Sequence, residues 1–147
     1  MITAAIDDTP YNIVLLLHIL TAFAAFAPAF VHPLLGEQTK AFNGETRSLF
    51  MSFVVRNGRR IYSPALILTG LLGFALQGMS DSAIEFSDGW IVAAILIWVV
   101  MNGILHAMIL PGEKALAAGD ETGESKVSIG GGAMTLLLVV MLYLMVF

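Results

Sequence analysis

The three histidines of this sequence, His18, His32 and His106, are the side chains best suited to chemistry. Each lies in a long apolar stretch that contains no Asp, Glu, Lys or Arg. An ionisable group at membrane depth is energetically costly and therefore often marks a functional site. A neutral imidazole can bind haem iron or a metal ion. The alternative for each histidine is an imidazole that is hydrogen-bonded to a backbone carbonyl or to Asn102 and binds no ligand.

His18 and His32 share one face of a predicted helix and lie about 21 Å apart along it, at a rise of about 1.5 Å per residue. Between them the same face carries only alanine, at Ala22, Ala25 and Ala29. Small side chains leave a shallow groove into which a neighbouring helix or a flat cofactor can pack. Small and polar residues on the second span predict a similar packing face.

His32 and His106 are expected at similar depth, because each lies shortly before a proline that we expect to end its helix, Pro33 and Pro111. We expect the two imidazoles to face each other as axial ligands of one b-type haem, since bis-histidine sites occur in four-helix bundles. Asn102 lies one turn before His106 and is expected to form hydrogen bonds near the site. The predicted cofactor-binding residues are His32, His106, His18 and Asn102, and the three histidines are also the candidate metal ligands.

Four apolar stretches predict an all-α transmembrane four-helix bundle that forms a single domain, residues 1–147. The chain is 58% hydrophobic and 12% charged, whereas a soluble domain has about 25% charged residues. Each stretch is long enough to cross a hydrocarbon core of about 30 Å. The predicted spans are residues 11–35, 61–79, 90–110 and 128–147.

All seven basic residues fall between the first and second spans or between the third and fourth. The positive-inside rule therefore predicts that these two loops are cytoplasmic and that both termini are outside. Residues 46–60 combine an apolar helical face with flanking arginines. This segment is either an interfacial helix or an N-terminal extension of the second span. We expect Asn57-Gly58 to separate it from that span.

Several classes of function are excluded. The sequence has no cysteine, so disulfides, thiolate metal sites and cysteine nucleophiles are absent. No nucleophile–base pair, paired carboxylates or phosphate-binding loop is found, and we predict no catalytic residue. Nucleic acid is not an expected partner, because no basic cluster of the required kind is present. Copper is a second metal candidate, since histidine and the eight methionines suit it.

The stretches LLLHILTAFAAFAPAF, GRRIYSPALILTGLLGF and WIVAAILIWVVMNGILHAMILP resemble an uncharacterised family of bacterial four-helix membrane proteins. That family is similar to the copper-resistance D domain and to the four-helix protoporphyrinogen oxidase, whose first helix carries a Leu-His-aliphatic motif like Leu17-His18-Ile19. The resemblance implies haem or copper handling in the prokaryotic plasma membrane. The oxidases place charged residues near their cofactor, and the predicted spans here contain none.

These observations favour a b-haem-binding redox or electron-transfer protein, or a subunit with that role. One alternative is a non-catalytic accessory or assembly subunit of a larger, respiratory-type membrane complex, whose alanine and glycine faces dock on partner helices. Another is copper handling or transport, although a strongly polar pathway is missing. Expected partners are membrane lipids together with copies of the same chain or other subunits.

Overall fold

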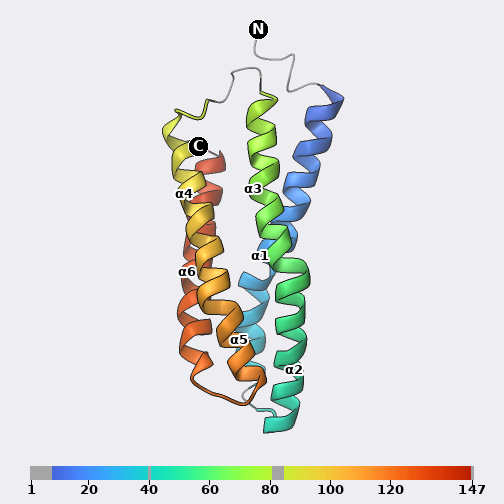
Figure 1. The fold of residues 1–147 in the computed structure, drawn as a ribbon, viewed down its shortest axis with the longest axis vertical. Coiled ribbons are helices and arrows are strands. Elements are labelled where there is room, and N and C mark those ends of the chain that lie inside the picture. Colours follow the sequence, from blue (N-terminus) through green and yellow to red (C-terminus); the bar gives the residue numbers. More distant parts are fainter. Residues whose placement is uncertain (1–7, 40, 81–84, 147) are drawn as a thin grey trace.

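The computed structural model describes residues 8–39, 41–80 and 85–146. Within these ranges the chain is helical, without strands, and forms four helices long and apolar enough to cross a membrane. This confirms the predicted all-α, four-span architecture (Figure 1). The helical segments are α1 (Thr9–Thr39), α2 (Gly44–Asn57), the π-helical turn η1 (Gly58–Tyr62), α3 (Ser63–Gly78), α4 (Gly89–Ile104), the π-helical turn η2 (Leu105–Ile109), α5 (Leu110–Ala117) and α6 (Gly123–Val146).

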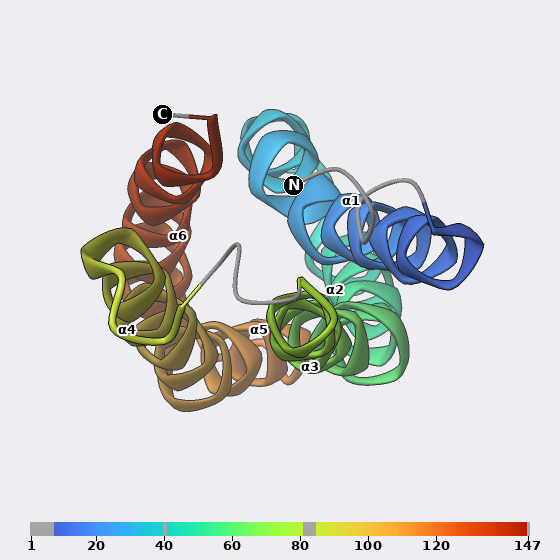
Figure 2. The ribbon, with the colours of Figure 1, turned by 90° about the horizontal axis from the view of Figure 1, so that it is seen from above.

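The four long helices surround a common axis. α1 lies beside α3, α3 beside α4, and α4 beside α6, which in turn reaches α1 (Figure 2). At one end of the bundle α2 packs on α5, and α5 packs on the first turns of α6 (Figure 1). We call this the basic end, because the basic residues of the described part of the chain gather there, namely Arg47, Arg56, Arg59, Arg60, Lys114 and Lys126.

Three predicted helix ends are wrong, because the helices continue past them. α1 passes Pro33 and ends at Thr39, α2 continues through Gly58 into α3, and α4 continues through Pro111 into α5. A π-helical turn ends two residues before Pro64 and another two residues before Pro111. Proline lacks an N–H and collides with the carbonyl four residues earlier in a regular α-helix. The wider π turn displaces that carbonyl, so the helix accommodates the proline and continues.

Residues 46–60 therefore form most of α2 and the start of η1, at the beginning of a continuous helix Gly44–Gly78 of 35 residues. Of the two interpretations of this segment, the structure favours the extension of the second span. A helix of this length is about 52 Å long, whereas the hydrocarbon core is about 30 Å thick. The α2 part thus extends beyond the core, where it covers α5.

The alanine face of α1 packs into the bundle as predicted. Ala25 is 8% exposed and belongs to a core with Leu66, Met101 and Leu138, whereas Phe23 is 73% exposed. The helix that α1 contacts most extensively is α3. The small-residue surface between the histidines packs into the bundle at Ala25, and Ala25 and Ala29 also line a cavity.

Gly70 on α3 permits an equally close contact with α4. An added Cβ would overlap the ring of Trp98, whose Nε1 donates a hydrogen bond to the Leu66 carbonyl at 2.8 Å. We expect Gly70→Ala to lower the free energy of unfolding in detergent by about 1–3 kcal/mol, because the ring must move. Gly103→Ala is the control, since nothing lies within 4 Å of an added Cβ there. Equal unfolding temperatures of the two variants would contradict the close α3–α4 contact.

Candidate functional site

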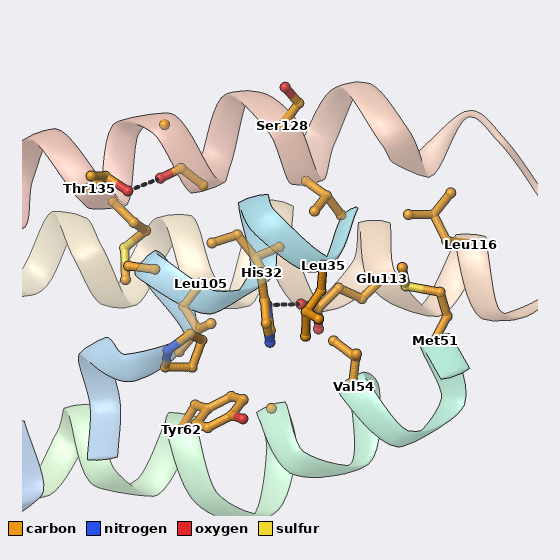
Figure 3. Close-up of a pocket in the computed structure, with 18 of the residues that line it drawn as sticks. His32, Leu35, Met51, Val54, Tyr62, Leu105, Glu113, Leu116, Ser128 and Thr135 are labelled. Atoms are coloured by element: carbon orange, nitrogen blue, oxygen red, sulfur yellow. Dashed lines mark hydrogen bonds and ion pairs between the residues drawn. The ribbon is translucent and has the colours of Figure 1, made fainter. Parts of the chain in front are cut away.

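A cavity of about 420 Å³ lies at the basic end among α1, α2, η2, α5 and α6 (Figure 3). Most of its wall is apolar and includes Ala25, Leu105 and Ile109. Its volume lies within the range of about 300–1,000 Å³ that is usual for sites of small molecules and cofactors. Its polar lining residues are His32, Thr39, Arg47, Tyr62, Glu113, Glu124, Ser128 and Thr135.

The central polar pair of this cavity is His32 on α1 and Glu113 on α5. His32 Nδ1 lies 3.4 Å from Glu113 Oε1, and the two side chains point toward each other (Figure 3). Glu113 is only 2% exposed. Its second oxygen, Oε2, has no hydrogen-bond partner among the described residues. A buried carboxylate with one unpartnered oxygen is unfavourable for stability, which is typical of a site shaped by function.

The π-helical turn η1 encloses this pair from the side of α2. Tyr62, its last residue, presents its ring edge-to-face to His32, with 5.8 Å between ring centroids and 68° between the planes. Gly58, the first residue of η1, lies close to α5. A Cβ added to Gly58 would be 2.7 Å from Leu110 and 3.4 Å from Glu113 Oε2. Gly58 is thus a close-contact position that lets the backbone approach the carboxylate. The expectation that Asn57-Gly58 breaks the helix is wrong, because the helix continues through Gly58. The glycine instead permits a close contact between η1 and α5.

Glu113 is a candidate site residue that the sequence prediction missed, because the third span was expected to end before Pro111. Leu105, Ile109 and Glu113 follow one another at intervals of four residues, and all three line the cavity. Residues at this spacing share a helix face. The sequence signal for Glu113 is therefore the four-residue spacing, which continues from Leu105 and Ile109 past Pro111.

His106 has surroundings different from those of His32. Its Nε2 lies 2.8 Å from Ser63 Oγ and its Nδ1 lies 2.9 Å from the Asn102 carbonyl oxygen. Nδ1 therefore donates to that carbonyl, and Nε2 accepts from the serine hydroxyl when the imidazole is neutral. His106 is exposed and is not among the residues that line the cavity. The structure does not bring His32 and His106 together around this cavity.

Asn102 and His18 both form local or packing hydrogen bonds. Asn102 Nδ2 donates to the Trp98 carbonyl at 2.9 Å, so its side chain is directed along its own helix. His18 Nδ1 lies 2.9 Å from the Thr69 carbonyl oxygen, and its ring packs against Gly73. The half-buried His18 therefore connects α1 to α3 through this hydrogen bond, and it does not line the cavity that contains His32.

The chemistry of the cavity is compatible with a haem-type cofactor. Because His32 Nδ1 faces Glu113, Nε2 is the ring nitrogen that remains free to bind iron. The thioether residues Met51 and Met134 and the cation Arg47 also line the cavity. Methionine is a known partner of histidine on haem iron, and arginine suits carboxylate substituents of a macrocycle. Among the described residues, no three His, Asp or Glu side chains converge as a metal site.

No protein-family model, curated protein or solved structure matches this chain. The candidate site is therefore defined by its own geometry. The resemblance to haem- and copper-handling membrane proteins stays a prediction.

Proposed function

We propose that this small integral membrane protein binds a b-type haem in the cavity at the basic end, with His32 Nε2 as an axial ligand, and acts in electron transfer. The observation that supports this proposal most strongly is the contact of 3.4 Å between His32 Nδ1 and the buried Glu113 carboxylate. Histidines that bind metal almost always donate their other ring N–H to a carboxylate or carbonyl, which fixes the tautomer and the ring orientation. The Glu113 carboxylate lies within contact distance of His32 Nδ1, where it can accept such a bond.

The roles of the chain's own residues follow from their positions. Glu113 holds the proton of His32 on Nδ1, so that Nε2 presents a lone pair, and the edge-to-face ring of Tyr62 limits rotation of the imidazole. Most of the wall around His32 is apolar. Arg47 lies where α2 extends beyond the hydrocarbon core, 3.9 Å from Glu121 and 3.8 Å from Glu124, and would exchange these exposed carboxylates for acidic substituents of the cofactor. Bound haem would supply one-electron chemistry.

The proposal includes a location and an orientation. The length of α1 from Thr9 to His32 is about 35 Å, slightly more than the hydrocarbon thickness of about 30 Å. His32 therefore lies near the boundary between hydrocarbon and headgroups at the basic end. We propose that this end faces the cytoplasm of a prokaryotic cell, in agreement with the positive-inside rule.

The test is an absorbance spectrum of protein purified after expression with added haem. We expect a Soret band in the oxidised protein and a shifted, sharper visible spectrum after addition of dithionite, as for other histidine-ligated haems. Absence of a Soret band after haem supplementation would overturn the proposal. It would favour the accessory-subunit alternative, which co-purification of partner subunits in mild detergent would then support.

A further inference from the structure

A second hollow, of about 430 Å³, lies on the surface of the bundle where η1 and α3 approach η2 and α5. It is distinct from the His32 cavity, and an inference drawn from it does not depend on haem binding. Three of its polar residues, Arg59, His106 and Lys114, are exposed. Its lining residues are Arg59, Ser63, His106, Leu110, Pro111 and Lys114.

The positive charges of this hollow have no acidic partner in the described part of the chain. The ion pairs found there join His32 to Glu113 and Arg47 to Glu121 and Glu124. Arg59 and Lys114 are thus available to an external anion. Guanidinium and ammonium groups are the usual protein donors to phosphate.

Ser63 and His106 add an ordered polar edge to the two cations. The bond from His106 Nδ1 to the Asn102 carbonyl fixes the ring, and Nε2 lies 2.8 Å from Ser63 Oγ. The hydroxyl of Ser63 is thereby held beside the hollow, where it can donate to a phosphate oxygen when the imidazole is protonated. Leu110 and Pro111 supply the apolar part of the wall.

The two cations lie at headgroup depth. From Gly78, the end of α3, back to Arg59 the helix rises about 29 Å, about one hydrocarbon thickness. From Gly89, the start of α4, to Lys114 it rises about 38 Å, within the thickness of about 40–45 Å that includes the headgroups.

An exposed apolar path leads from the hollow toward the hydrocarbon core. On α3 the residues one and two turns beyond Ser63, Ile67 and Leu71, are exposed. On α4 the residue two turns before His106, Val99, is exposed as well. A ligand whose anionic group occupies the hollow can therefore lay hydrocarbon chains along α3 and α4.

From this combination we propose that the hollow binds the phosphate of an anionic phospholipid of the phosphatidylglycerol type. Arg59 and Lys114 pair with the phosphate, Ser63 donates a hydrogen bond to it when the His106 imidazole is protonated, and the acyl chains cover the exposed faces of α3 and α4. Basic pockets between membrane helices on the cytoplasmic side are suited to such headgroups. The site would hold a bound lipid where the π turns η1 and η2 approach each other.

The test compares phosphatidylglycerol with phosphatidylcholine of the same acyl chains, each added to the full-length, delipidated protein in detergent. Retained lipid is counted by native mass spectrometry, and the unfolding temperature is measured in parallel. We expect retention of phosphatidylglycerol, and a loss of about thirtyfold in its affinity for Arg59→Gln combined with Lys114→Gln, because each basic residue at the membrane surface contributes about 1 kcal/mol to binding of an anionic lipid. Lys114→Gln alone, at an exposed position, is the milder variant if the double variant misfolds.

The matched control is Arg56→Gln combined with Arg60→Gln, which removes the same charge at the same end. Both arginines are exposed and neither lines the hollow. Equal loss of phosphatidylglycerol in this control would overturn the proposal in favour of diffuse surface attraction. Equal retention of phosphatidylcholine would also overturn it. Stabilisation by inorganic phosphate alone, as large as that by the lipid, would identify a phosphate site instead of a lipid site.

Discussion

His32→Ala is expected to remove the Soret band of protein expressed with added haem, whereas His106→Ala and His18→Ala are expected to retain it. His32 is the only histidine among the residues that line the cavity within the described part of the chain. Loss of a group that merely orients a metal ligand costs about 10–100-fold in affinity, and loss of the ligand itself should cost at least as much. Absorbance per mole of purified protein is the measurement.

Free imidazole separates loss of a ligand from loss of the fold. Alanine leaves room for the ring that it replaces, so added imidazole should restore a low-spin spectrum in His32→Ala if His32 is an axial ligand. His106→Ala is the matched control, because His106 is exposed and its hydrogen bonds go to Ser63 and to the Asn102 carbonyl. Loss of the band in His18→Ala or His106→Ala, with His32→Ala unaffected, would place the haem elsewhere in the bundle.

The four spans could be predicted from the sequence because a membrane span depends on the hydropathy of about 20 consecutive residues taken together, and no single residue decides it. Helix ends depend on single turns and are less predictable. Pro111 would end a regular helix, yet the preceding π turn, Leu105–Ile109, accommodates it. Since hydropathy gives no sign of a π turn, Glu113 was assigned to a loop.

The expected pairing of His32 with His106 depends on single turns in the same way. Depth follows from counting residues from a helix end, and His32 does lie beside a polar residue of the third span. The direction of a side chain around the helix axis depends on every preceding turn. Leu105 is buried and lines the cavity, whereas His106, the next residue around the π-helical turn, is exposed beside Ser63. The partner of His32 in the structure is therefore Glu113, whereas the sequence predicts His106.

The single variants Glu113→Leu and His32→Leu are both expected to lower the stability of the haem-free protein, whereas their combination should not. Glu113→Leu leaves the His32 ring without its partner, at a cost of about 1–3 kcal/mol. His32→Leu leaves a carboxylate that is 2% exposed without any partner, at a cost of about 3–5 kcal/mol. Unfolding in detergent followed by circular dichroism is the measurement.

The double variant should be as stable as the parent protein, or more stable by about 1–4 kcal/mol, because apolar side chains of similar volume replace a buried polar pair. Oxygen Oε2 of Glu113 has no hydrogen-bond partner among the described residues, so the pair is only partly compensated in the native fold. A pair that lowers the stability of the haem-free protein has a role other than packing, and the double variant, which lacks the proposed ligand His32, should bind no haem. If instead the double variant is less stable than both single variants, His32 and Glu113 serve the packing of α1 on α5, and the site proposed for the cofactor is a structural contact.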